Sequence, residues 1–258
     1  MTDLFDMELR ARRRDRAARN GPELFLFERA FADCLERVAL LDRRFKRALL
    51  IGCPDASWPA RLAELAARID VREPGPLFAA ATGSEVIVED HWAPEEKAYD
   101  LVVAIGTLDT VNDLPLALRL IRHSMQGDGL FIGAVPGGNN LPRLRSAMRA
   151  ADALDGEARP HVHPRIEPAA LAPLLESAGF IKPVVDLDRV QLSYPTLRKL
   201  VADLRAMGAT NVLNARAPAL SRAAVAVAEE AFAADGHDGR TMEVVELLHF
   251  ATWSPQQH

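Results

Sequence analysis

Short apolar runs alternate with amphipathic segments along most of the chain, a pattern typical of α/β proteins. Runs that are almost wholly apolar predict buried strands, and apolar residues at three- and four-residue steps predict helices. We expect strands at 48–52, 69–73, 85–90, 99–108, 127–135, 182–194 and 241–253. We expect helices at 61–69, 112–125, 167–180, 195–208 and 221–236, and a loop entering a further helix at 136–148.

The last apolar run, 241–253, is compatible with a strand or a helix. A strand is preferred because it forms a hairpin-like pair with 182–194 and completes a set of seven. Strands that alternate with helices imply right-handed crossovers and a mostly parallel sheet. The expected fold class is therefore α/β and Rossmann-like: a seven-stranded, mostly parallel sheet with helices on both faces and a helical insertion before the last strand.

Two helices are expected before the sheet begins. Six arginines lie between residues 10 and 19, and Asn20, Gly21 and Pro22 then interrupt the helical pattern. A second helix carries an apolar stripe formed by Phe27, Phe31, Cys34, Leu35 and Val38. We expect 1–44 to be a basic and amphipathic helical extension and 45–258 to be a single globular domain. The arginine-rich start is either a solvated helix face or a contact for an acidic partner.

Composition narrows the classes of function. The 258-residue chain has 49% hydrophobic residues, a net charge of −5 and a pI of about 5.8, so no nucleic-acid partner is expected. No apolar run is long enough to cross a bilayer, and the first residues lack the apolar part of a secretory signal. Peripheral membrane contact stays open. Two cysteines, Cys34 and Cys53, form no Cys-rich framework, which favours a cytoplasmic location.

The candidate cofactor site lies where the predicted strands end. Gly52 ends the first strand and opens a tight turn, the place of the glycine loop in nucleotide-binding α/β domains. Glu73 ends the second strand about 20 residues later, the usual distance of an acid that binds ribose hydroxyls. Glu89 and Asp90 end the third strand, where they could bind an adenine amino group. Each acid could instead be a solvated or capping carboxylate, and Cys53 is expected to be apolar filler.

This arrangement resembles the class I S-adenosylmethionine-dependent methyltransferase fold. Aligned with that family's acidic–apolar–Gly–x–Gly–x–Gly motif, the chain has Leu50 at the acid and Gly52, Pro54 and Ala56 at the glycines. Leu50 cannot accept a hydrogen bond and Pro54 lacks a backbone donor. Loss of one charged hydrogen bond weakens binding by about 1.5–3 kcal/mol. The resemblance implies S-adenosylmethionine as the cofactor, lined by Gly52, Cys53, Glu73, Glu89, Asp90, Ile105 and Gly106.

The downstream segments are more specific: VNDLPLAL, GDGLFIGAVPGGNNLPRLR, PHVHP and DLDRVQLSYPTLRKLVADLRAMGATN. Together with FDMELRARRRDRAA near the start, they resemble the methyltransferase-like assembly factors of respiratory complex I, the family of mitochondrial assembly factor five. The resemblance covers nearly the whole chain. It implies a protein substrate, a complex I subunit or its bacterial equivalent, and hydroxylation of an arginine rather than methylation.

Several substrate-side positions depart from that family's pattern. Its LHWVNDLP reads LDTVNDLP here, so Asp109 and Thr110 replace a His–Trp pair. Its GGDTL reads GGNNL, so Asn139 replaces an acid. By the resemblance, Asp109, Asn139 and Tyr194 would face the substrate.

Three kinds of function follow from the sequence. The first is a methyltransferase-like enzyme that acts on a protein side chain. The second is a binding module, an assembly factor that kept the fold and lost the cofactor. The third is a carrier-protein or small-molecule methyltransferase, which shares the fold but lacks the downstream segments. His161 and His163 flank Val162 without a recognised ligand motif, so no metal is expected.

Overall fold

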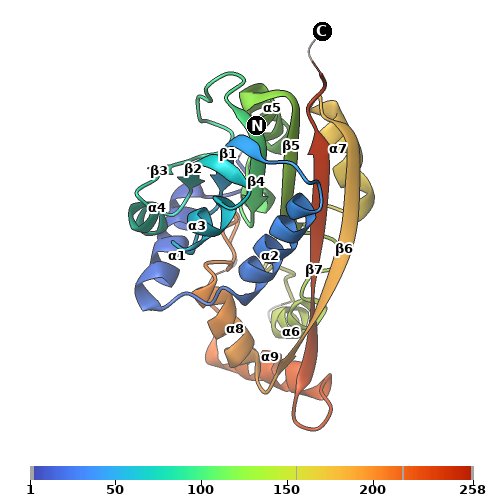
Figure 1. Cartoon of the computed structure of the whole chain (residues 1–258). Helices are drawn as coiled ribbons and strands as arrows, with labels where there is room; N and C mark the ends of the chain where they lie inside the picture. Colours follow the sequence, from blue (N-terminus) through green and yellow to red (C-terminus); the bar gives the residue numbers. More distant parts are fainter. Residues whose placement is uncertain (1–2, 155, 217, 257–258) are drawn as a thin grey trace.

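A single twisted sheet runs through the computed structural model, which describes residues 3–154, 156–216 and 218–256. The strand order is β3-β2-β1-β4-β5-β7-β6 (Figure 1), and β7 runs antiparallel to its neighbours β5 and β6. The strands are β1 Phe45–Ile51, β2 Ala66–Glu73, β3 Glu85–Val86, β4 Tyr99–Ile105, β5 Met125–Pro136, β6 Ile181–Tyr194 and β7 Thr241–Trp253. The predicted seven-stranded, mostly parallel α/β fold is confirmed.

Helices cover both faces of the sheet (Figure 1). They are α1 Met7–Asn20, α2 Phe25–Ala39, α3 Trp58–Leu62, α4 Pro76–Thr82, α5 Leu114–Ser124, α6 Pro142–Asp152, α7 Pro168–Ser177, α8 Leu197–Ala206 and α9 Arg222–Ala234, with a 3₁₀ turn η1 at Leu108–Thr110. The expected insertion before the last strand is α8 and α9. The predicted division between 1–44 and 45–258 stays a prediction.

Two apolar layers lie on opposite faces of the sheet because successive strand side chains alternate. Leu50 of β1 faces the layer that contains α2, α3, α6, α8 and α9, whereas Leu49 faces the layer that contains α5 and α7. In the first layer Phe31 of α2 stacks on Trp58 of α3, with ring centroids 4.2 Å apart and planes 9° apart. This stack ties the N-terminal helices to the turn that follows β1.

The segment after β1 differs from the prediction. The expected helix at 61–69 ends at Leu62, and β2 begins at Ala66 because Ala66 pairs with Phe45 and Arg68 pairs with Arg47. Strand pairing therefore overrides the helical pattern.

The third predicted strand, 85–90, is reduced to the two residues of β3, so Glu89 and Asp90 lie in the loop beyond it. Helix α4 was not predicted. It starts at Pro76 directly after Gly75, in keeping with the preference of proline for a first helical turn.

The long apolar run at 241–253 is a strand, β7, which is the alternative that the sequence favoured over a helix. It pairs along its whole length with β6 and through residues 247–253 with β5. Helix α5 begins after Asp113, whose side chain accepts a hydrogen bond from the N–H of Leu116, as expected for a capping residue. In the part of the chain that the structure describes, none of the helices has the length and apolarity to cross a membrane.

We expect Phe31→Ala to lower the free energy of unfolding by about 3–5 kcal/mol, because the side chain is fully buried and leaves a cavity beside Trp58. Urea unfolding followed by circular dichroism measures the change. The matched control is Leu40→Ala at the C-terminal end of the same helix, where the residue is 84% exposed. We expect this substitution to change the free energy of unfolding by at most about 0.5 kcal/mol. Equal effects of the two substitutions would contradict the assigned packing.

Candidate functional site at the carboxyl ends of the strands

Two glycines bring the ends of β1 and β4 into close contact. Gly52 has φ +82°, and a Cβ there would lie 2.3 Å from the carbonyl oxygen of Ile105. Gly106 has φ +60°, and a Cβ there would lie 2.3 Å from the Phe27 ring. Both positions therefore require glycine, for backbone conformation and for space.

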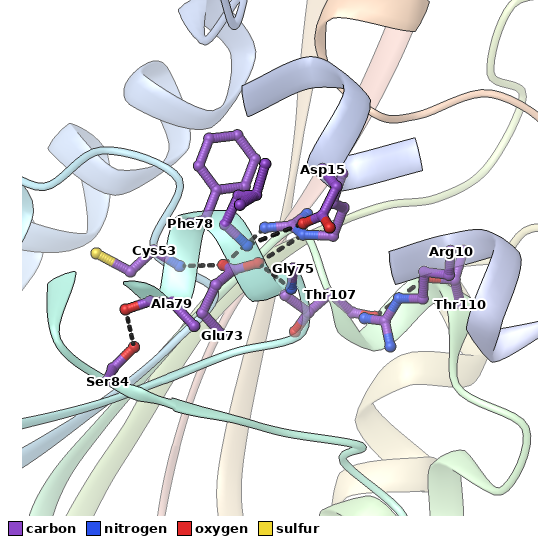
Figure 2. A network of polar contacts seen from close by, with 12 residues as sticks. Arg10, Asp15, Cys53, Glu73, Gly75, Phe78, Ala79, Ser84, Thr107 and Thr110 are labelled. Carbon is purple, nitrogen blue, oxygen red and sulfur yellow. Dashed lines mark hydrogen bonds and ion pairs between the residues drawn. The ribbon is translucent and has the colours of Figure 1, made fainter. Parts of the chain in front are cut away.

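Glu73 is fully buried at the end of β2 and every contact of its carboxylate is internal (Figure 2). The backbone N–H groups of Cys53 and Gly75 donate to it at 2.7 and 2.6 Å. The guanidinium of Arg14, on α1, donates to both oxygens at 2.6 and 2.7 Å. The residue predicted to bind ribose hydroxyls is thus saturated by four donors from the protein.

Glu89 is held in the same way by the arginine one turn earlier on α1. Arg10 donates to both carboxylate oxygens at 2.7 Å and to the carbonyl oxygen of Thr107 at 2.8 Å. The side chains of Arg10 and Glu89 are 5% and 0% exposed, respectively. Because residues four apart share one helix face, Arg10 and Arg14 together lay α1 across the strand ends.

Contacts along the rest of the N-terminal segment fix α1 in this position. The carboxylate of Asp15 accepts from the N–H of Leu77 at 2.9 Å, at the start of α4. Upstream, Phe5 is buried, bridges to Leu213, and exchanges hydrogen bonds with the side chain of Asn112. Helix α1 is therefore held by the segment before it and by Asp15 in its second half, as well as by its ion pairs.

Little space remains where the cofactor was expected. Two cavities of about 50 and 60 Å³ lie beside Gly106, lined in part by Arg10, Arg14 and Phe27. Sites for small organic ligands have volumes of about 300–1,000 Å³. With Phe27 against Gly106 and Arg14 on Glu73, the residues present do not fit S-adenosylmethionine in this arrangement.

The remaining predicted cofactor residues lie nearby with other contacts. Asp90 accepts hydrogen bonds from the N–H of Asp113 and the ring of His91, both at 2.8 Å. Burial opposes ionisation of Asp90, but these hydrogen bonds outweigh it and hold its pKa below the usual value. Burial, reinforced by the charge of Glu73, raises the pKa of the Cys53 thiol to about 12, so the thiol stays protonated. Ile105 is buried at the end of β4.

The three predicted substrate residues do not come together. Asp109 lies beside Gly106 in η1 and forms a largely buried ion pair with Arg165. Asn139 is exposed, and its backbone N–H donates to Glu246. Tyr194 is buried beside a separate cavity near Asp203. Their roles in substrate binding stay predictions, and of the three Asp109 is the one that lines the small cavity beside Gly106.

The two loop histidines have separate partners. His161 contacts Asp152 at 2.8 Å, whereas the Nε2 of His163 accepts from the N–H of Val212 at 2.7 Å. Burial and neighbouring arginine charge lower the pKa of His163 to about 4, so its ring is neutral near pH 7. Among the described residues, no group of three or more His, Cys, Asp or Glu side chains could hold a metal ion.

Sequence reasoning missed Arg10, Arg14 and Phe27, the residues that close the strand ends. A signal was present, since two arginines four residues apart on one helix match two acids that follow neighbouring strands. The hydrophobic pattern gives no information on how α1 lies relative to the sheet, so that pairing could not be assigned.

The strand order, the glycine turn after β1 and the acid after β2 define a methyltransferase-type fold. A family model described as "Methyltransferase domain" matches residues 23–182. A solved structure, the YcgJ protein of Bacillus subtilis, has a TM-score of 0.57 at 10% identity, covering 88% of this chain and 100% of that chain. The N-methyltransferase NodS of Bradyrhizobium japonicum, solved with S-adenosyl-L-homocysteine, has a TM-score of 0.53 at 14% identity, covering 96% and 99%.

Proteins of similar sequence define the family more closely than the fold does. The mitochondrial arginine-hydroxylase NDUFAF5 of Rattus norvegicus is 32% identical, covering 97% of this chain and 77% of the relative. The Homo sapiens protein of the same name is 31% identical with the same coverage. The chain belongs to the methyltransferase-domain family and, within it, to the group of arginine-hydroxylase NDUFAF5. A malonyl-[acyl-carrier protein] O-methyltransferase of Xylella fastidiosa is 30% identical, but only over 62% of this chain and 53% of the relative.

We expect Arg14→Met to lower the free energy of unfolding by about 3–5 kcal/mol, because it leaves the Glu73 carboxylate buried without its cation. Adding Glu73→Gln in the same chain is expected to recover part of that loss, since no unpaired charge remains. The measurement is urea unfolding of both variants. Arg12→Met is the control, because the Arg12 side chain is 64% exposed on the same helix. An Arg14→Met effect as small as that of Arg12→Met would exclude a structural role for the ion pair.

Proposed function

We propose that this chain acts on an arginine side chain of a protein partner, a subunit of respiratory complex I or of an equivalent bacterial enzyme, during assembly. The observation that carries the proposal is that three carboxylates at the strand ends each hold a guanidinium. Glu73 binds Arg14, Glu89 binds Arg10 and Asp109 binds Arg165. These three carboxylate–guanidinium pairs support an arginine-directed function, although each carboxylate is paired with an arginine of the chain itself.

The extent of the sequence match supports the same conclusion. The rat and human relatives named arginine-hydroxylase align over 97% of this chain, so the match extends beyond the part shared by methyltransferase domains. Asp109 is the group most suited to contact a substrate arginine, because it lies next to Gly106 and its cation comes from a loop. The relatives are named as mitochondrial proteins, and the cytoplasmic location expected for this chain stays a proposal.

Mass spectrometry of the partner enzyme tests the arginine-directed function. We expect peptides of a complex I subunit, or of its bacterial equivalent, to carry an arginine with one added oxygen in the wild type and an unmodified arginine after deletion of this gene. Re-expression of the wild-type chain should restore the modification, and Asp109→Asn should restore it poorly while the protein remains folded. An added methyl group in place of oxygen would assign methyl transfer. Identical peptides with and without the gene would overturn the proposal.

A second candidate is an assembly protein that binds its partner without a cofactor. The observation that favours it is the closure of the strand ends by Phe27, Arg10 and Arg14, beside which the two cavities measure only about 50 and 60 Å³. This candidate binds the same partner as the first candidate but does not modify it.

Calorimetric titration with S-adenosylmethionine tests whether the second candidate is free of this cofactor. A cofactor-free protein is expected to give no binding heat at millimolar ligand in the wild type or in Phe27→Ala, which removes the ring packed on Gly106. Phe25→Ala, at a partly exposed position on the same helix, is the control for helix stability. Binding to the wild type would contradict the cofactor-free candidate. Binding only to Phe27→Ala would show that the intact pocket is closed by this side chain.

A further inference from the structure

A further cavity is lined by residues of α1, α6, α8 and α9. Its volume is about 760 Å³, within the range of sites that bind small organic ligands. Arg165 lines both this cavity and the small space beside Gly106, so the two regions are neighbours. Neither the sequence relatives nor the arginine-directed function assigns a ligand to it.

Part of the cavity wall is apolar. Helix α6 contributes Leu144 and Met148, α8 contributes Val201 and Leu204, and α9 contributes Val225. The four side chains of α6 and α8 belong to one layer of the core, and with Val225 they offer aliphatic contacts to a ligand.

The wall formed by α1 and the end of α8 is strongly basic. In the part of the chain that the structure describes, Arg13, Arg16 and Arg205 have no carboxylate within ion-pair distance. Arg16 donates a hydrogen bond to the hydroxyl of Thr210 at 3.4 Å, and its Nε is buried without a hydrogen-bond partner among the described residues. The remaining arginines that line the cavity do have carboxylate partners. Arg165, Arg198 and Arg216 pair with Asp109, Glu229 and Asp6, respectively.

The three unpaired arginines repel one another. Burial, followed by the charges of Arg16, Arg216 and Arg205, lowers the pKa of Arg13 to about 10. Arg13 is still protonated near pH 7, so the cluster carries its full positive charge, with Arg13 and Arg16 half-buried and Arg205 exposed. An anion placed among these guanidiniums would relieve the repulsion and supply the missing acceptors.

We infer that this cavity binds an amphiphilic organic anion, with a phosphate or carboxylate among Arg13, Arg16 and Arg205 and an aliphatic body along the apolar wall. The inference does not depend on the proposed arginine-directed function. A substrate arginine would be repelled by the same cluster, so the inferred ligand differs in charge from the proposed arginine substrate. A planar guanidinium suits both oxyanions, because it can donate two parallel hydrogen bonds.

Calorimetric titration with soluble probes tests the inference. Decyl phosphate and decanoate, used below their micelle concentrations, are expected to bind to the full chain. Inorganic phosphate tests the charged group alone, and decanol and decyltrimethylammonium test the aliphatic chain alone. Inorganic phosphate, decanol and decyltrimethylammonium are each expected to bind at least about tenfold more weakly than decyl phosphate. The reason is that one charged hydrogen bond changes the affinity by roughly tenfold to hundredfold.

Matched variants locate the site. Arg13→Gln with Arg16→Gln is expected to weaken decyl phosphate binding by at least about tenfold, because it removes two charged donors. Arg12→Gln with Arg19→Gln is the control: the same helix loses the same charge, but these side chains are 64% and 63% exposed and do not line the cavity. If the first variant fails to fold, Arg205→Gln at an exposed position takes its place. Met148→Gln tests the apolar wall and should weaken decyl phosphate more than inorganic phosphate.

Four results would overturn the inference. They are no binding of either amphiphilic anion at millimolar concentration, equal affinity for the cationic or neutral amphiphile, equal affinity for inorganic phosphate, and equal losses in the cavity and control variants. Stronger binding of decyl phosphate than of decanoate would favour a phosphate-bearing ligand within the inferred class, and the reverse would favour a carboxylate. None of these outcomes depends on arginine modification, so the two proposals fail independently.

Discussion

Two arginine–glutamate ion pairs buried at the carboxyl edge of the sheet determine how the N-terminal third of this protein is organised. Moving four charged groups out of water carries a large desolvation penalty, which close pairing and extra hydrogen bonds must offset. Glu73 meets this condition with two backbone N–H donors besides Arg14, and Arg10 meets it through the carbonyl of Thr107. These contacts fix the position of helix α1. Helix α1 in turn holds the start of α4 through the hydrogen bond between Asp15 and Leu77.

Much of the fold follows from local pattern. The apolar runs of β1, β4 and β5 are buried on both faces, so their composition alone marks them as central strands. The errors lie at the edge of the sheet, where residues 66–68 have a helical pattern but pair with β1, and where only two residues of the third strand find a partner. Pairing between distant segments decides these boundaries, and local propensity does not contain that information.

The position of Glu73 at the end of β2 was predictable from the sequence, but the contacts of its carboxylate were not. The spacing from Gly52 to Glu73 placed an acid at the correct strand end, because strand–turn–helix–strand units have a limited range of lengths. Its partner Arg14 lies 59 residues away on a helix outside that unit. The altered glycine motif indicated a modified pocket. The groups that close it are Phe27 and the α1 arginines, which the motif itself does not contain.

Helix α1 presents arginines on two neighbouring faces, Arg10 and Arg14 toward the strand ends and Arg13 and Arg16 toward the large cavity. One anchored helix therefore forms a wall of both regions. A ligand at the strand ends that needs α1 displaced and a ligand in the cavity that needs α1 in place would oppose each other. By thermodynamic linkage, each would lower the affinity of the other by the same factor, although the two molecules never touch. Two such ligands would therefore compete through the position of a single helix.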